Sequence, residues 1–278
     1  RGQTGLQAKM TLPQHLISGS QAWFLPGAGH ELALVEAMHR NSLLLGEVMD
    51  VFNGIQTSRN DVYVITQWQG AGDNYVAFLR HGQEWLIERE ILKPFFESDR
   101  GRSRLLSFHP LQPTALLIFP YHIHRQNEQL QATLIPPDVM KSRFPRAWAW
   151  LEHNRAVLEP SARKINPAPS SPDEWYCYGR VQALTDFEDR PKIIVGVNSL
   201  GDKYVYDDTD TVLASGGTAG EAAVAPFRES ARRSPYDLYF ILALLNHKAV
   251  EYFCRKRGSP FRGGWYARGT AVLKEIPV

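Results

Sequence analysis

The sequence predicts an α+β fold in which mixed and antiparallel β-sheets pack against a few helices. Between Leu45 and about Ile135, short β-prone runs alternate with turn residues, a pattern typical of antiparallel sheets. From Pro145 onward, apolar residues recur at helical spacing on either side of one further strand. With 278 residues, 44% of them hydrophobic and 22% charged, the chain has an ordinary globular composition and enough length to bury a core.

Residue patterns in the sequence predict two helices and four strands. In Gly29–Asn41, apolar residues lie three positions apart, which predicts a short amphipathic helix. Pro145 begins a second helix that Pro160 ends, because proline fits the first turn of a helix but not its interior. Strands are expected at residues 61–65, 75–79, 115–119 and 193–197, where β-branched and aromatic residues gather, whereas residues 84–95 fit either state.

The longest helix is expected after a Gly- and Ala-rich separator at residues 214–225. Ser234 is its predicted N-cap, Pro235 stands at the first helical position, and Asp237 completes a capping box. Residues 166–173 read as an exposed loop, because prolines and serines dominate them.

A polar loop, GIQTSRNDVYVI at residues 54–65, is the most informative stretch. Asn53-Gly54 can take the positive backbone angles of a tight turn. The residues that concentrate hydrogen-bonding groups just before the strand are Gln56, Thr57, Ser58, Arg59 and Asn60. Such a loop suits the reading of a polar polymer, since Asn and Gln pair bidentately with adenine and Arg with guanine. The alternative is a turn in which these side chains only cap the backbone.

The charge totals give little support for a nucleic-acid binder, because 31 basic and 29 acidic residues leave a net charge of +2. Their distribution is more informative, since ten basic and four acidic residues lie from Arg228 onward. Residues there that combine cations, glycines and an aromatic ring, and are expected to contact phosphate, are Arg262, Gly263, Gly264, Tyr266 and Arg268. For the cations at 255–257, the alternative is a favourable place at a helix end.

Composition also bears on membrane association, cellular location and metal binding. No apolar run approaches the roughly 20 residues of a membrane span, so no membrane partner is expected. Cys177 and Cys254 lack a CxxC partner, which favours a reduced, cytoplasmic location. His122 and His124 would share one face of a strand and could ligate a metal, but no third ligand is suggested and no metal site is expected.

Further segments follow the polar loop in a fixed order. They are LIFPY (117–121), RFPRAWAWLEHNRAVLEPSARK (143–164), EWYCYGR (174–180), RPKIIV (190–195), YFILALLNHKAVEYFCR (239–255) and FRGGWYARGTAVLKEIPV (261–278). This order resembles the TaqI-like C-terminal specificity domain, the target-recognition part of N6-adenine DNA methyltransferases and fused type II restriction-modification enzymes. The resemblance covers roughly residues 20–278. The family loop carries glycine where Ser58 stands; if that position needs a left-handed backbone, serine adopts it at some strain.

The resemblance implies a division of the chain and a function. Residues 1–19 would be a linker from an N-terminal methyltransferase domain, 20–140 a β-rich half of the specificity domain, and 141–278 its α/β half. The partners would be double-stranded DNA and the methyltransferase domain of the same polypeptide, and His122 and Arg125 would join the DNA contacts. The alternative is a protein-interaction or scaffold domain that kept the fold but lost DNA binding.

Catalytic motifs are not found in the sequence. Asn166-Pro167-Ala168-Pro169 lacks the second consecutive proline and the aromatic residue of an adenine-gripping loop, and no glycine-rich loop has the spacing for S-adenosylmethionine. We therefore expect no catalytic residue and no cofactor here, and S-adenosylmethionine in the separate catalytic domain; an enzyme with an undetected site is a third alternative. Acidic residues expected only at the surface are Glu88 and Glu90, near Lys93, and Asp207, Asp208 and Asp210.

Overall fold

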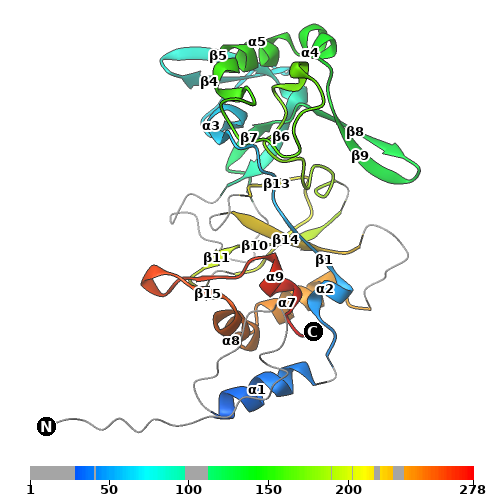
Figure 1. The fold of residues 1–278 in the computed structure, drawn as a ribbon, viewed down its shortest axis with the longest axis vertical. Coiled ribbons are helices and arrows are strands. Elements are labelled where there is room, and N and C mark those ends of the chain that lie inside the picture. The colour runs from blue at the N-terminus through cyan, green and yellow to red at the C-terminus, as the bar shows by residue number, and fades with distance from the viewer. Residues whose placement is uncertain are drawn as a thin grey trace, which may run out of the picture.

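The computed structural model describes residues 29–40, 42–97, 112–188, 190–201, 203–215, 220–227 and 235–278. Within these residues the fold is α+β, as predicted, with several small and mostly antiparallel sheets. Two lobes follow each other along the long axis, and each encloses its own hydrophobic core (Figure 1).

Helices and strands alternate irregularly along the chain. The helices are α1 (Gly29–His39), α2 (Leu45–Val48), α3 (Asn60–Tyr63), α4 (Pro137–Arg143), α5 (Pro145–His153), α6 (Arg155–Leu158), α7 (Leu238–Leu245), α8 (Lys248–Arg257) and α9 (Thr270–Lys274). The strands are β1 (Asp50–Asn53), β2 (Val64–Ile65), β3 (Gln69–Ala71), β4 (Tyr75–Arg80), β5 (Gln83–Glu88), β6 (Leu92–Phe96), β7 (Ala115–Ile118), β8 (Tyr121–Gln126), β9 (Gln129–Leu134), β10 (Lys192–Gly196), β11 (Asn198–Ser199), β12 (Val205–Asp207), β13 (Val212–Leu213), β14 (Glu221–Ala225), β15 (Ser259–Pro260) and β16 (Tyr266–Ala267).

One antiparallel sheet, in the order β1-β14-β10-β12, joins the lobes. Its side chains alternate between two cores, because successive residues of a strand point to opposite faces. The paired residues Ile194 and Ala223 belong to the core of the upper lobe in Figure 1, and the next pair, Ile193 and Val224, to that of the lower lobe. Since β1 and β14 come from opposite sides of residue 140, both halves of the chain build this sheet.

The upper lobe holds the sheets β13-β6-β7-β2 and β3-β4-β5 and the β8-β9 hairpin. Helix α5 packs on β5, where the ring of Trp150 lies edge-on to Phe78 and its Nε1 donates to Val62 O at 2.9 Å. Glu88 accepts hydrogen bonds from the backbone N–H groups of Arg146 and Ala147 at the start of α5. The prediction that Glu88 lies on the surface is therefore wrong, because its carboxylate is buried as a helix cap.

The lower lobe packs α2 and α7–α9 against the joining sheet, and β11-β16-β15 form a small sheet beside it. The predicted long helix is two helices. Asp237 caps α7 by accepting from Tyr239 N at 2.7 Å, α7 ends before Asn246, and His247 caps α8. The predicted N-cap, Ser234, lies outside the described residues.

Several other local predictions are wrong. Residues 60–63 form helix α3 rather than a strand, so only Val64–Ile65 keeps strand character. The separator at 214–225 contains β14, which is buried along its whole length. Asp207 is not solvated but forms a fully buried ion pair with Lys192 at 2.7 Å. Helix α1 forms as predicted and ends at His39, two residues early.

Two further features concern the cysteines and the helices. Cys177 and Cys254 are both free and buried, and burial raises the pKa of Cys254 to about 11. Among the described residues, none of the helices has the length and apolarity to cross a bilayer.

Candidate nucleic-acid interface

The polar loop runs between β1 and α3 and is held by backbone contacts on both sides. A β-carbon on Gly54 would lie 2.4 Å from Leu213 O in β13, so this position needs glycine for close packing. Ile55 N then donates to the same carbonyl at 2.8 Å. The predicted tight turn at Asn53-Gly54 is wrong, because Asn53 still belongs to β1 and neither residue has a positive φ.

Residues 179 and 180 of the EWYCYGR segment pair with the loop. Gly179 N donates to Thr57 O at 2.9 Å, and Arg180 N to Gln56 O at 3.1 Å. Ser58 has a φ of 62°, the left-handed conformation considered for the position where the family carries glycine. Its side chain covers Gly179 so closely that a β-carbon there would lie 1.8 Å from Ser58 Oγ.

Two of the predicted contact residues turn inward. The Thr57 hydroxyl is buried, donates to Asn60 Oδ1 at 2.5 Å and accepts from Arg59 N at 3.0 Å. The Asn60 amide donates to Glu97 Oε1 at 2.9 Å. Both side chains therefore make contacts within the protein: Thr57 binds the backbone of Arg59 just before α3, which is the turn role that the sequence left open, and Asn60 joins the loop to Glu97.

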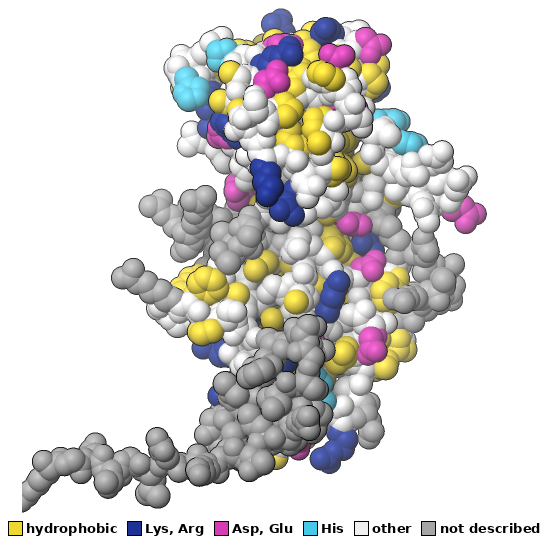
Figure 2. Space-filling model, in the orientation of Figure 1, with side chains coloured by type: hydrophobic (Ala, Val, Ile, Leu, Met, Phe, Trp, Pro, Cys, Tyr) yellow, Lys and Arg dark blue, Asp and Glu magenta, His cyan; other side chains and the backbone are white. Residues whose placement is uncertain are grey.

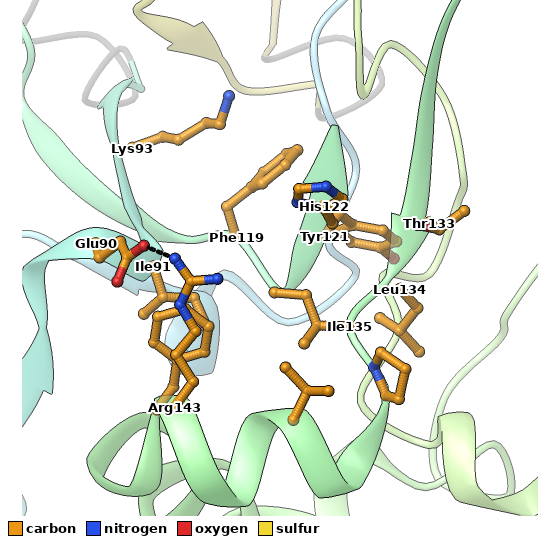
Figure 3. Close-up of a pocket in the computed structure, with 13 residues that line it drawn as sticks. Glu90, Ile91, Lys93, Phe119, Tyr121, His122, Thr133, Leu134, Ile135 and Arg143 are labelled. Carbon is orange, nitrogen blue, oxygen red and sulfur yellow. Dashed lines mark hydrogen bonds and ion pairs between the residues drawn. The ribbon is translucent and has the colours of Figure 1, made fainter. Parts of the chain in front are cut away.

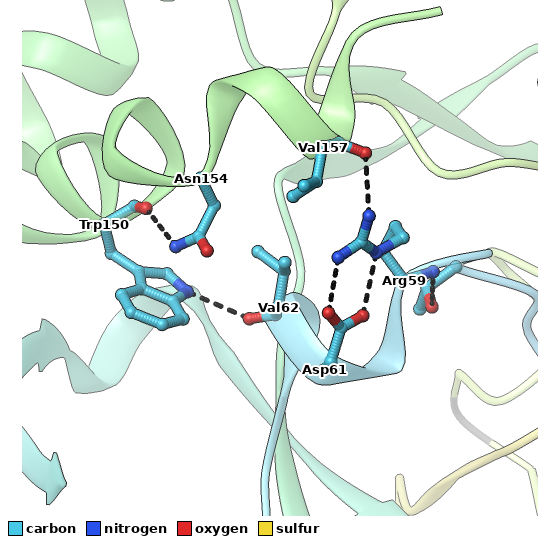
Figure 4. Close-up of polar contacts among 7 residues, drawn as sticks. Arg59, Asp61, Val62, Trp150, Asn154 and Val157 are labelled. Carbon is cyan, nitrogen blue, oxygen red and sulfur yellow. Dashed lines mark hydrogen bonds and ion pairs between the residues drawn. The ribbon is translucent and has the colours of Figure 1, made fainter. Parts of the chain in front are cut away.

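Arg59 makes a two-pronged ion pair with the next carboxylate along the chain (Figure 4). Its Nε and Nη2 donate to the two oxygens of Asp61 at 2.9 and 2.5 Å, and Nη1 donates to Val157 O at 3.2 Å. The hydrogen bond from Arg59 holds the pKa of Asp61 below its ordinary value. A base contact by Arg59 would have to break these bonds, so its observed role is to fasten α3 to α6.

Arg163 fixes the underside of the loop, and sequence reasoning missed it. Its buried guanidinium donates to four carbonyls: Leu158 O at 2.6 Å, Thr57 O at 3.2 Å, Trp175 O at 2.8 Å and Cys177 O at 2.6 Å. Four cations occur in the 143–164 segment after its first residue, at 146, 155, 163 and 164, and a single sequence does not distinguish the buried one.

The outer side of this scaffold carries polar and basic residues, which we call the loop surface: Gln56, Ser58, Lys164, Asn166 and Arg180. Asn166 N donates to Gly179 O at 2.8 Å, which brings the 164–166 backbone beside Arg180. Lys164 and Arg180 are exposed, and neither side chain makes a hydrogen bond or ion pair within the described part of the chain. Both occur in segments that carry the family resemblance, but the sequence did not indicate their exposure.

His122 and Arg125 lie on β8, in a hairpin that extends from the upper lobe (Figure 1). The rings of His122 and His124 stack at 5.9 Å, so the two residues share a strand face as predicted. Arg125 is exposed, and its Nη1 donates to Glu128 O at 2.9 Å. Across the described ranges, no cluster of His, Cys, Asp and Glu could hold a metal ion.

The C-terminal tail divides between surface and core. Gly263 and Gly264 are exposed and have φ values of 75° and 81°, so both need glycine's freedom. Tyr266 is buried and donates to the Glu251 carboxylate. Arg268 is fully buried, with Nε donating to Gly196 O at 3.1 Å and the guanidinium 4.5 Å from the centre of the Tyr204 ring.

Tyr266 and Arg268 thus belong to the core of the lower lobe, and we leave them out of the interface. Arg262 begins a short turn, Arg262–Gly264, and its side chain lies outside what the structure describes. Trp265 is only half-buried, whereas its neighbour Tyr266 is buried.

A pocket of about 420 Å³ lies between the root of the hairpin and α4 (Figure 3). His122, Phe119, Arg143 and Lys93 are among its lining residues, and the Lys93 ammonium lies 4.5 Å from the centre of the Phe119 ring. Arg143 pairs with Glu90, and Lys93 pairs with Glu188. Glu88, Glu90 and Lys93 therefore each have a different partner.

The chain is homologous to a region of a known restriction-modification enzyme. It is 33% identical over 263 residues to the Escherichia coli protein described as type II restriction enzyme and methyltransferase RM.Eco57I, and this match covers 93% of the chain and 25% of that protein. No family model matches the chain. The chain thus spans about a quarter of the length of the curated relative that it matches.

Proposed function

We propose that this chain is the DNA target-recognition region of a site-specific N6-adenine DNA methyltransferase or fused restriction-modification enzyme. It binds duplex DNA and sets the sequence at which the enzyme acts. The observation that supports this most is the match over 93% of the chain to a protein whose name joins both activities. Methyl transfer from S-adenosylmethionine is assigned to another domain of the same polypeptide.

The loop surface supports the proposal in physical terms. Its backbone is fixed by Arg163 and by pairing with residues 179–180, so little conformational freedom is lost on binding. Lys164 and Arg180 are free to meet phosphates, which position a protein on the duplex. Gln56 and Ser58 present hydrogen-bonding groups beside them.

The proposal predicts DNA binding that weakens with salt. We expect a mobility shift with unmethylated and methylated duplex pools, with the affinity falling steeply across a salt series. Lys164→Ala and Arg180→Ala should each reduce the salt slope by about one. Matched controls are Lys248→Ala and Arg89→Ala, which remove exposed cations on other elements and should leave the slope unchanged.

A specific observation supports the scaffold alternative. Basic side chains are scattered over the face shown in Figure 2, with acidic side chains between them, and the net charge is only +2. The same mobility shift distinguishes the two functions. Absence of salt-dependent duplex binding by the folded protein would favour a protein-interaction role.

A further inference from the structure

The β8-β9 hairpin has two unlike faces. Its strands pair along six rungs from Tyr121–Leu134 to Gln126–Gln129. The turn residues Asn127 and Glu128 have φ values of 48° and 65°, as a two-residue hairpin loop requires. The hairpin extends away from the upper lobe (Figure 1), and residues 125–129 at its outer end are exposed.

One face holds the hairpin to the protein. Its rungs are Tyr121–Leu134, Ile123–Ala132 and Arg125–Leu130. Tyr121 belongs to the core of the upper lobe, and Ile123, Ala132 and Leu134 pack against it. This anchoring fixes the direction of the ribbon, because the period-two alternation turns every second residue to the other face. On that face the rung nearest the lobe, His122–Thr133, also lines the pocket beside α4, and the two outer rungs extend beyond it.

The opposite face is entirely polar and carries no formal charge when both histidines are neutral. Its rungs are His122–Thr133, His124–Gln131 and Gln126–Gln129. Five of these six side chains are exposed, and His124 is half-buried. A solvated strand face commonly carries Lys or Glu, whereas this one consists of amides, imidazoles and a hydroxyl. We call it the polar ribbon face.

We propose that the polar ribbon face enters the major groove of DNA and reads base edges. This rests on the proposed function and adds where and how the sequence is read. The major groove admits a two-stranded β-ribbon, and its base edges present hydrogen-bond donors and acceptors. Glutamine can pair bidentately with adenine, and uncharged side chains can match base edges without the sequence-independent attraction that cations have for phosphate.

The spacing of the rungs matches the spacing of base pairs. Neighbouring polar rungs lie two residues apart, about 6.6 Å, so the three rungs span about 13 Å. At about 3.4 Å per base pair, this length corresponds to roughly four base pairs. Because the loop surface carries the free cations and the polar ribbon face carries none, positioning on the backbone and reading of bases fall to different elements.

Glutamine pairs on two different sheets provide the test. The wild-type protein first selects its preferred duplex from a random pool, and its affinities for that duplex and for a scrambled one are then measured. Gln126→Ala/Gln131→Ala removes two amides from the polar ribbon face. The matched control, Gln69→Ala/Gln83→Ala, removes two exposed amides from the β3-β4-β5 sheet.

We expect the ratio of the two affinities to fall at least about fivefold for each glutamine–base pairing that the substitutions remove. The affinity for the scrambled duplex and the salt slope should stay as in the wild type, and the control should keep the full ratio. A ratio that is unchanged, or an equal reduction of affinity for both duplexes, overturns the inference but leaves the proposed function standing. If the folded wild type binds no duplex at all, the proposed function and this inference both fail.

Discussion

At the scale of single residues, Arg163 determines the shape of the loop surface more than any side chain on it. One guanidinium joins the polar loop, the end of α6 and the EWYCYGR segment through four carbonyls. The predicted contact residues Thr57, Arg59 and Asn60 serve the same framework. These three polar side chains of the predicted loop therefore support its shape.

Replacing Arg163 should destabilise the fold, because Arg163→Ala leaves buried carbonyls without a donor. We expect a loss on the order of 3 kcal/mol in the free energy of unfolding, measured by chemical denaturation. Lys164→Ala, one position along and exposed, should change it by less than about 0.5 kcal/mol. Equal effects of the two substitutions would contradict the role given to Arg163.

Ser58 and Gly179 should behave as a coupled pair. Gly179→Ala alone brings its β-carbon against Ser58 and should lower the melting temperature. Ser58→Gly alone should be neutral or stabilising, because glycine adopts a φ of 62° without strain. In the double variant the space is free again, so most of the melting temperature should be recovered. Additive effects, measured by a double-mutant cycle, would show that the two positions do not touch.

At the scale of elements, sequence patterns predicted helices and strands well where local propensity was sufficient, and less well where a cap or break depends on a distant contact. The strand at 193–197 and the start of the helix at Pro145 were predicted because propensity and packing agree there. The prediction that this helix continues to Pro160 is wrong, because it divides at Asn154 into α5 and α6. The division between α7 and α8 was not predicted either, since the apolar stripe continues through it. The break depends on Asn246, whose side chain binds both backbone groups of Tyr204, a residue more than forty positions away. Local periodicity cannot show such a contact.

Asn246→Ala should therefore cost stability without changing the helix propensity much. It leaves the N–H and C=O of Tyr204 without their partners, for an expected decrease of about 1–3 kcal/mol in the free energy of unfolding. Lys248→Ala, exposed two positions later, is the control. If circular dichroism and denaturation show Asn246→Ala to be as stable as the control, the hydrogen bonds to Tyr204 do not hold the boundary between α7 and α8.

At the scale of the whole molecule, the sheet β1-β14-β10-β12 makes two lobes into one framework. Ala222 and Val224 face one core and Ala223 faces the other. This explains why the β14 residues after Glu221 are all small and apolar and do not alternate with polar residues. From the sequence alone the two cores are not known, and a short Ala-rich run then resembles a linker. The strand β14 could therefore not be predicted. The pairing of residues 50–53 with residues 222–225 likewise joins segments far apart in the sequence, and local patterns do not indicate it.

The same limit applies to the candidate site. The motif order led to predicted contacts in the polar loop and at His122 and Arg125. The exposure of Lys164 and Arg180 and the polar ribbon face emerge only when the backbone is folded. Conversely, Arg268 looked like a phosphate ligand in a basic tail and is a core residue. Charge counted along the sequence does not distinguish a buried cation from a free one.

The central claim is that this chain sets the DNA sequence at which the enzyme acts, and an exchange of regions tests it most directly. The quarter of the Escherichia coli protein that matches this chain would be replaced by it, and methylated adenines would be mapped on genomic DNA by sequencing. We predict that the chimera methylates a new sequence, different from that of the unaltered protein. A folded, active chimera that still methylates the original sequence would contradict the account.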